Sequence, residues 1–349
     1  MKILITGVHG FVGSNLVAYL APGNEIYGLD IIAPEKEGVV KTYSWDDLIE
    51  VQSSKFKVQG EVIPDVDAII HLAGKAHDVK SDGQGQKDVY MKINYGLTVK
   101  IFDYFMAHSQ CRKFIFFSTA KSAADKVDGI LTEDVVPAPV GPYGESKIAA
   151  ENYILNKFKE FNGLRSLRED PLAPLEQLEH LIPTSKDVYI MRPCMIHGPG
   201  NKGNLNLLYN AVRKGLPWPL GAFENKRTFT SVENVCFAVN GVLTKDVESG
   251  IYNMGDDEPL STNELIEEIC LSLGRKPRIW KLPKGLMNGI ARVGGWLHLP
   301  LTSERLRKLT ENYISSNAKI KAALGVERMP VDARTGLRRT LEAFRGVGG

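Results

Sequence analysis

The stretch YGESK holds a tyrosine and a lysine, Tyr143 and Lys147, four residues apart, so a helix would present both on one face. A tyrosine hydroxyl has a reference pKa of about 10 and is a poor base at neutral pH. A nearby cation stabilises the phenolate and lowers that pKa, so the pair could pass a proton while an alcohol and a ketone interconvert. Because such pairs are also common on exposed helices, other residues must decide whether this one is catalytic.

Three glycines, Gly7, Gly10 and Gly13, follow the apolar run KILIT and lead into FVGSNLVAYL. In a dinucleotide-binding turn the first glycine permits a tight turn, the second lets the backbone approach a pyrophosphate, and the third lets helix and strand pack closely. The N-terminus of the helix then faces the anion. A strand before the turn and a helix after it are the context that this motif requires.

Asp30 lies at the end of the next predicted strand. A carboxylate at this place can accept hydrogen bonds from the 2′ and 3′ hydroxyls of a ribose, and it would repel a 2′-phosphate. The following residues, Ile31, Ile32 and Ala33, bring no positive charge. The sequence therefore predicts NAD rather than NADP, and a solvated aspartate at a strand end is the alternative.

Apolar runs alternate with helix-like segments through the first half of the chain. Periodicity predicts strands at 2–6, 25–31, 67–74, 113–120 and 187–193, and helices at 11–20, 93–109 and 143–161. This alternation predicts an α/β fold, a Rossmann-type doubly wound parallel sheet with helices on both faces. The connection at 162–186 is unusually long and is interpreted as a surface insertion of unknown role.

After His197 the pattern changes to turn-rich loops between short elements. We expect an NAD-binding Rossmann domain over 1–195 and a smaller C-terminal α/β lobe for the substrate over 196–349. Some chain of the second part is expected to return to the Rossmann sheet.

Several motifs together resemble the extended short-chain dehydrogenase/reductase family, in its sugar-nucleotide epimerase/dehydratase branch. In chain order they are GVHGFVG, Asp30, HLAG at 71–74, Asn94 in KINYGLT, FSTA at 117–120, YGESK at 143–147, and RPCMIHGPG at 192–200. The resemblance covers nearly the whole chain. It implies an NAD-dependent enzyme with a Rossmann fold, and a homodimer formed through the helices at 88–109 and 143–161.

The resemblance also implies roles for individual residues. Tyr143 would be the acid/base, Lys147 would orient the nicotinamide ribose and lower the tyrosine pKa, and Thr119 would hydrogen-bond the reacting sugar oxygen. The residues expected to line the cofactor are Gly7, Gly10, Phe11, Val12, Gly13, Asp30, Ile31, Leu72, Ala73, Gly74, Asn94, Tyr143, Lys147 and Pro193. For Asn94, a helix residue that makes a local hydrogen bond is the alternative.

Candidate substrate contacts lie in the second half of the chain. Arg227 matches the arginine that contacts a sugar-nucleotide diphosphate in the family, with an exposed loop arginine as the alternative. Lys202 and Asn204, in GPGNKGN, could contact diphosphate or uracil, and a solvated loop is equally compatible with them. His197 is assigned no catalytic role, and no metal site is expected.

The chain departs from two branches of the family. Ala120 and Lys121 stand where sugar-nucleotide 4,6-dehydratases carry an Asp–Glu pair, which disfavours elimination of water. Thr228 and Asn234 stand where typical 4-epimerases have acidic residues, and STAKSAAD replaces their Val-Tyr-Gly continuation.

STAK and the stretch HGPGNKGNLNLLYNAVRKGLPWPLGAFENKR resemble a narrower bacterial group that includes UDP-sugar 4-keto reductases. We therefore expect an NAD(H)-dependent enzyme acting at C4 of a UDP-sugar. Reduction of UDP-2-acetamido-4-keto-2,6-dideoxyhexose for surface polysaccharide is favoured, and 4-epimerisation of UDP-glucose or UDP-N-acetylglucosamine is the alternative. A non-catalytic NAD-sensing protein is more remote, because a sensor does not need a proton shuttle.

The amino-acid composition limits the kinds of binding partner that can be expected. The 43 basic and 41 acidic residues give a net charge of +2, which gives no reason to expect nucleic acid or an anionic membrane as a partner. The four cysteines form no CxxC pair, so a zinc site or redox dithiol is not indicated, and a cytoplasmic protein is expected.

No signal peptide or membrane span is predicted. The most apolar stretch, 285–301, is interpreted as a helix packed on the smaller lobe, with a membrane-surface contact near Trp296 as a minor alternative.

Overall fold

The computed structural model describes residues 1–45, 48–49, 57–58, 61–76, 84–168, 185–201, 203–296 and 301–346. The chain forms two compact units. The first comprises Met1–Asp125, Asp134–Pro193 and Ala238–Tyr252, and the second comprises Lys126–Glu133, Cys194–Phe237 and Asn253–Gly349. Unlike the predicted boundary near 195, these units place 126–133 in the second unit, whereas 238–252 lies in the first unit, where some returning chain was expected.

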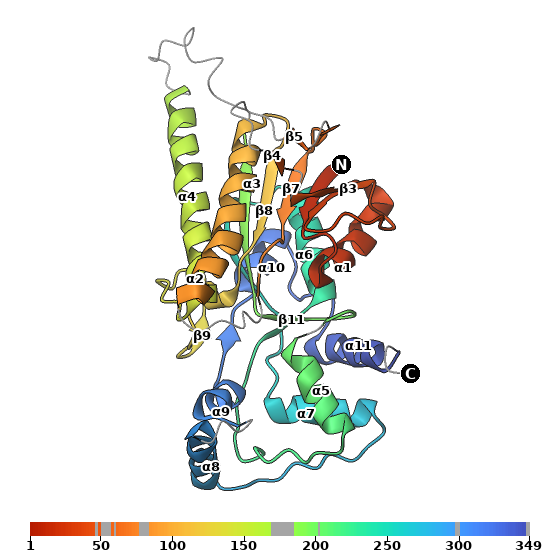
Figure 1. The fold of residues 1–349 in the computed structure, drawn as a ribbon, viewed down its shortest axis with the longest axis vertical. Coiled ribbons are helices and arrows are strands. Elements are labelled where there is room, and N and C mark those ends of the chain that lie inside the picture. Colours follow the sequence, from red (N-terminus) through yellow and green to blue (C-terminus); the bar gives the residue numbers. More distant parts are fainter. Residues whose placement is uncertain are drawn as a thin grey trace. The chain divides into compact units, whose positions relative to one another are not determined.

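The first unit is built on a seven-stranded sheet with the order β13-β10-β8-β7-β1-β2-β3. All neighbouring pairs from β10 to β3 are parallel. The predicted Rossmann-type α/β class is confirmed (Figure 1). The strands are β1 (Lys2–Thr6), β2 (Glu25–Asp30), β3 (Lys41–Ser44), β7 (Ala68–His71), β8 (Lys113–Phe117), β10 (Asp187–Pro193) and β13 (Gly250–Met254).

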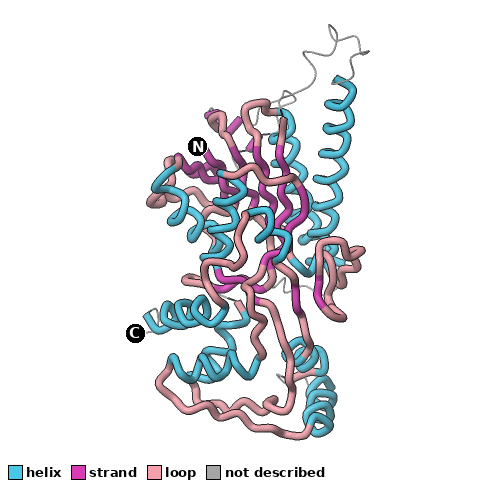
Figure 2. The backbone as a smooth tube through the Cα atoms, turned by 180° about the vertical axis from the view of Figure 1, so that it is seen from behind, coloured by secondary structure: helices cyan, strands magenta, loops and turns pink. Residues whose placement is uncertain are grey.

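Helices cover both faces of this sheet, as Figures 1 and 2 show. β1, β7, β8 and β10 are almost entirely buried, which is why their sequences are continuous apolar runs rather than alternating ones. Phe102 and Phe105 on one helix and Ala150 and Ile154 on another pack with Phe114 of β8. The helices of this unit are α1 (Phe11–Leu20), α2 (Gln84–Tyr90), α3 (Gly96–Ala107), α4 (Pro142–Arg168) and part of α6 (Val232–Thr244).

Helix α4 is longer than the sequence predicted. It continues past the expected end at 161 to Arg168, so the first residues of the proposed insertion are helical. The rest of that insertion, from 169 to 184, lies outside the described residues. The side chains of Ala150 and Ile154 on α4 belong to the core cluster that includes Phe102 and Phe105 of α3, and the homodimer stays a prediction.

The second unit combines short strand pairs with a helical core. Strand β9 (Ile130–Leu131) pairs in parallel with β14 (Ile314–Ser315), which is why 126–133 belongs to this unit. Strand β11 (Met195–His197) pairs with β12 (Phe229–Ser231). The remaining helices are α5 (Asn204–Arg213), α7 (Thr262–Ser272), α8 (Lys284–Trp296), α9 (Ser303–Thr310), α10 (Ala318–Leu324) and α11 (Ala333–Gly346).

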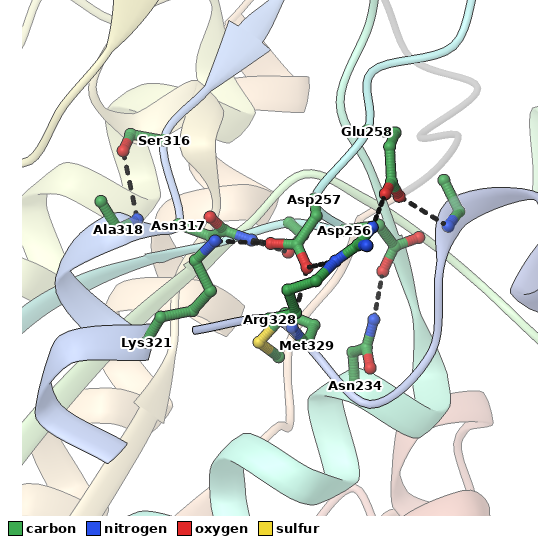
Figure 3. Close-up of polar contacts among 12 residues, drawn as sticks. Asn234, Asp256, Asp257, Glu258, Ser316, Asn317, Ala318, Lys321, Arg328 and Met329 are labelled. Atoms are coloured by element: carbon green, nitrogen blue, oxygen red, sulfur yellow. Dashed lines mark hydrogen bonds and ion pairs between the residues drawn. The ribbon is translucent and has the colours of Figure 1, made fainter. Parts of the chain in front are cut away.

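An acidic turn ties the C-terminal segment of the second unit together (Figure 3). The Asp257 carboxylate accepts hydrogen bonds from Asn317 Nδ2 at 2.9 Å, Lys321 Nζ at 2.7 Å and the Met329 N–H at 2.8 Å. Burial opposes the charged form of Asp257, but these hydrogen bonds outweigh it and lower its pKa. Lys321 and Arg328 in this segment therefore have carboxylate partners.

Among the described residues, no helix combines the length and apolar character needed to cross a bilayer.

Candidate active site

The glycine turn between β1 and α1 has the backbone that the sequence predicts for it. Gly7 has φ +71°, in the left-handed region, and a Cβ there would lie 3.1 Å from the Ala73 nitrogen. A Cβ on Gly13 would collide with the Gly7 carbonyl oxygen and would lie 2.9 Å from Val8 Cα, so only glycine lets α1 approach β1 this closely. Gly10 is the N-cap of α1 and supplies no side-chain cap. The N–H groups of the first turn are thus available to an anion such as a pyrophosphate.

Asp30 is held beside this turn by two backbone hydrogen bonds. Its Oδ2 accepts from the His9 N–H at 2.8 Å and its Oδ1 from the Ile31 N–H at 2.7 Å. Each carboxylate oxygen has a second lone-pair site, which suits a ribose hydroxyl as a further donor. Ile31 and Ile32 are exposed next to it. Lys36 is a cation that was not predicted to belong to this site. Its Nζ donates to Ser14 Oγ, in the first part of α1, at 3.0 Å.

A buried histidine, also missed from the sequence, fixes the end of β7. His71 Nδ1 lies 2.7 Å from Thr6 Oγ1, and its Nε2 lies 3.0 Å from Thr98 Oγ1. The Thr98 hydroxyl donates to a carbonyl one turn back, so it accepts from Nε2–H, and Nδ1 accepts from Thr6. Burial first, and then the charge of Lys147, hold the pKa of His71 well below its usual value, so the ring is neutral.

The Thr6 oxygen in turn accepts the N–H groups of Leu72, at 3.2 Å, and Ala73, at 3.0 Å. This chain of hydrogen bonds sets the course of HLAG, the segment expected to line the cofactor. The next residue, Gly74, lies so close to Lys147 that a Cβ would be 3.2 Å from its Nζ. The backbone at Gly74 therefore lies next to Lys147, the predicted catalytic lysine.

Asn94 lies buried in a π-helical turn, Met91–Tyr95, that joins α2 to α3. Its Oδ1 accepts the Lys75 N–H at 2.7 Å, and its Nδ2 donates to the Lys75 carbonyl at 3.1 Å and to Ser146 Oγ at 2.9 Å. These bonds join segments far apart in the chain, so the alternative of a local hydrogen bond is wrong. The amide hydrogens are used within the protein, and Asn94 ties the HLAG loop to α4.

Tyr143 and Thr119 are brought together by α4 and the end of β8, so that their side chains interact. Burial raises the pKa of Tyr143 to about 12; the bond to Thr119 opposes this shift and Tyr90 adds to it. The expectation that Lys147 lowers this pKa below its ordinary value is not met in this structure, where burial is the largest influence and Lys147 is not among the groups that shift the pKa of Tyr143. At neutral pH the Tyr143 hydroxyl is protonated.

Lys147 is also buried, one helical turn after Tyr143. Its Nζ donates to the Phe117 carbonyl at 2.9 Å and lies 4.8 Å from the centre of the Phe116 ring. Burial lowers the pKa of Lys147 to about 8, against the opposing effect of Glu151. The ammonium group is thus mainly charged at neutral pH, and two of its three hydrogens remain after the bond to Phe117.

A buried ion pair behind these residues was not foreseen. Arg192 Nε lies 3.1 Å from both carboxylate oxygens of Glu151, and both side chains are almost fully buried. Glu151 also accepts from Ser122 Oγ at 2.5 Å and from Ser118 Oγ. Because Thr119 lies between these serines, the pair fixes the segment that carries it. The available signal was Glu151 four residues after Lys147, on the same helix face.

The other predicted residues are dispersed. Phe11 and Val12 form the start of α1, and Pro193 ends β10. Asn204 and Arg227 belong to the second unit, where Asn204 begins α5 and Arg227 donates to the Lys308 carbonyl. Lys202 lies outside the described residues. The substrate roles of these three residues stay predictions.

Comparison with known proteins shows what the chain is similar to. A UDP-glucose 4-epimerase of Vibrio cholerae is 29% identical over 293 residues, covering 81% of this chain and 78% of that protein. A dTDP-4-dehydro-6-deoxyglucose reductase of Escherichia coli is 24% identical, covering 78% of this chain and 82% of that protein.

Solved structures show the same fold. A UDP-N-acetylglucosamine 4-epimerase from Bacillus cereus superposes with a TM-score of 0.70 at 20% identity, covering 99% of this chain and all of that one. MoeE5, solved with UDP-glucose and NAD, gives a TM-score of 0.70 at 21% identity over the full length of both chains. The model of the NAD-dependent epimerase/dehydratase family matches residues 3–255.

Proposed function

The chain belongs to the NAD-dependent epimerase/dehydratase family, and we propose that it transfers hydride and proton at C4 of a UDP-sugar. The observation that carries this proposal is the juxtaposition of the Tyr143 and Thr119 side chains, with the buried ammonium of Lys147 one turn after Tyr143 on α4. This set of groups suits the interconversion of a secondary alcohol and a ketone. The UDP-sugar relatives support the substrate class.

The residues around the glycine turn fit NAD. The uncapped first turn of α1 can receive the pyrophosphate, and the Asp30 carboxylate can receive the adenosine ribose. When bound, the cofactor supplies the hydride chemistry. The protein supplies position, the charge of Lys147 and the proton of Tyr143.

The protonation state of Tyr143 suits the role of proton donor in reduction. In reduction, the Tyr143 hydroxyl gives its proton to the sugar oxygen at C4, and its raised pKa keeps that proton in place at neutral pH. Thr119 hydrogen-bonds the same oxygen, and the charged Lys147 stabilises the phenolate that remains. In oxidation, Tyr143 would have to lose its proton first. We favour a reductase of UDP-2-acetamido-4-keto-2,6-dideoxyhexose, because STAK and the stretch that follows His197 resemble the group that includes UDP-sugar 4-keto reductases.

Dehydration is disfavoured by the residues after Thr119. Ala120 is buried, and the Lys121 ammonium pairs with Asp125 at 3.5 Å. Neither side chain can act as the carboxylic acid that elimination of water needs.

A 4-epimerase of UDP-glucose or UDP-N-acetylglucosamine is the second candidate. It is supported by the similarity to the Vibrio cholerae enzyme and by the fold shared with the Bacillus cereus epimerase. An epimerase reuses its bound cofactor within each turnover, whereas a reductase consumes NADH. The two reactions therefore differ in stoichiometry.

The test supplies the purified protein with NADH and UDP-2-acetamido-2,6-dideoxy-4-hexulose, and separately with UDP-hexoses and no reductant. Oxidation of one NADH per sugar, with a reduced product, supports the reductase. Inversion at C4 without NADH consumption supports the epimerase. Bound NAD with neither reaction would contradict the proposal and favour an NAD-sensing protein.

A further inference from the structure

Helix α8 of the second unit has apolar side chains on two faces, and only one face is covered. Met287 and Ala291 are buried in a small cluster with Leu220 and Leu306. A second row on the same helix, Leu286, Ile290 and Val293, is 53%, 43% and 52% exposed. Its spacing of four and three residues aligns these side chains along one stripe. The stripe has no covering partner in the described chain.

The sequence around α8 carries charge of one sign. Residues 269–303 contain six lysines and arginines and no aspartate or glutamate, in a chain whose basic and acidic totals are 43 and 41. The near balance of the whole chain therefore hides a basic segment. Its cations, all exposed, are Arg275, Lys276, Arg278, Lys281, Lys284 and Arg292.

Some other cations of the second unit have carboxylate partners. Lys321 pairs with Asp257, and Arg328 pairs with Glu258, as Figure 3 shows. In the described part of the chain, none of the six cations of 269–303 forms an ion pair with a carboxylate. Arg275 instead donates to two backbone carbonyls at the end of α5. The positive charges of this basic segment are therefore available to an external anion.

An exposed tryptophan lies in the same segment. Trp280 is 53% exposed, between Arg278 and Lys281. Tryptophan has an apolar ring and one polar N–H, a combination enriched at the boundary between lipid headgroups and acyl chains. A protein partner would need an apolar groove lined by carboxylates. An anionic bilayer has apolar acyl chains directly beneath negatively charged phosphate headgroups, so one surface could receive both the apolar stripe and the cations.

We propose that α8 and the preceding loop bind the surface of a bilayer that contains anionic phospholipid. Leu286, Ile290 and Val293 enter the headgroup boundary, and the cations of 269–303 lie against lipid phosphates. The helix lies in the plane of the membrane surface and does not span it. This property is independent of the reaction at C4.

The test is flotation of the full-length protein with vesicles of phosphatidylcholine mixed with phosphatidylglycerol. We expect binding at low salt, release at high salt, and no binding to pure phosphatidylcholine. Replacing two cations, Lys281→Glu with Arg292→Glu, should weaken binding about tenfold or more, because each cation near an anionic surface contributes about 1 kcal/mol. Ile290→Glu should abolish it.

Matched controls lie on the first unit. Lys159→Glu removes an exposed cation of α4, and Val136→Ser removes a side chain that is 84% exposed. Both should bind vesicles like wild type, and all variants should keep the wild-type circular dichroism and NAD binding. Absence of vesicle binding, or binding that Ile290→Glu leaves intact, would overturn the proposal. A self-association that Ile290→Glu abolishes, without vesicle binding, would assign the stripe to a second copy of the chain instead.

Discussion

At the scale of single residues, we propose that Tyr143 gives the proton to the oxygen on sugar C4. Tyr143→Phe removes only the hydroxyl, so we expect turnover to fall about 10²- to 10⁴-fold, the usual contribution of a positioned acid. Thr119→Val should lower turnover in the same way. NAD affinity should stay near wild type in both variants. Steady-state kinetics and NAD titration check this. Tyr19→Phe, at an exposed side chain of α1, is the control. Wild-type turnover in Tyr143→Phe would refute the assignment.

The pH dependence of reduction is predicted to report Lys147. Burial lowers its pKa to about 8, so the ammonium charge is present below that pH and is lost as pH rises through it. Because we propose that this charge stabilises the Tyr143 phenolate during reduction, kcat/KM for reduction should be level below pH 8 and fall above it. Lys147→Arg keeps the charge and should remove this alkaline limb, even if its plateau is lower. An unchanged limb in Lys147→Arg would assign the titration to another group.

At the scale of elements, the close packing of α1 on β1 depends on Gly13. In Gly13→Ala the new Cβ meets the Gly7 carbonyl and Val8, so the turn must open. Stability should fall by about 1–3 kcal/mol, as for other overpacked sites, and the NAD dissociation constant should rise about tenfold or more. Gly23→Ala is the matched control, because no atom lies within 4 Å of its added Cβ. Tight NAD binding by Gly13→Ala would contradict the pyrophosphate turn.

The buried Glu151–Arg192 pair is predicted to hold α4, β10 and the Thr119 segment together. Glu151→Gln leaves the Arg192 charge buried without a counterion and should lower the free energy of unfolding by about 3–5 kcal/mol. Adding Arg192→Met should recover part of this loss. Denaturant unfolding measures both, with Glu160→Gln as an exposed control. A loss in the double variant equal to the sum of the losses in Glu151→Gln and Arg192→Met alone would show that the two charges are not coupled.

The elements that position the site could largely be predicted from sequence. KILIT, the glycine turn and the following helix are encoded within consecutive residues, as are Tyr143 and Lys147 on α4. His71, Glu151 and Arg192 could not be assigned their roles, because their partners come from segments tens of residues away. Periodicity finds a buried face but does not tell which polar groups meet there.

The boundaries of the two units and the exposed face of α8 could not be predicted in full from the sequence. The two-residue strand β9 is too short to show a period, so the transfer of 126–133 to the second unit had no local signal. Helix α8 was interpreted as packed because it is apolar. Sequence alone could not show that Met287 is covered while Ile290 is exposed.

At the scale of the whole molecule, cofactor binding should stabilise the folded chain by linkage. NAD at a hundred times its dissociation constant is worth about 2.7 kcal/mol, so thermal unfolding should move to higher temperature. NADP at the same concentration should give little shift, because its 2′-phosphate meets the Asp30 carboxylate. Asp30→Ala should reduce the difference between the two cofactors. Equal shifts by NAD and NADP in the wild type would contradict the role of Asp30.

The central claim is that hydride moves at C4 of the sugar. The most direct measurement is the position of deuterium in the product by NMR, starting from NADH deuterated at C4 of the nicotinamide with the 4-keto UDP-sugar, or from UDP-hexose deuterated at sugar C4. The account predicts deuterium on sugar C4 in the product of whichever substrate turns over, delivered from NADH or retained through inversion. Deuterium at another carbon, or loss of the C4 label to solvent, would contradict it.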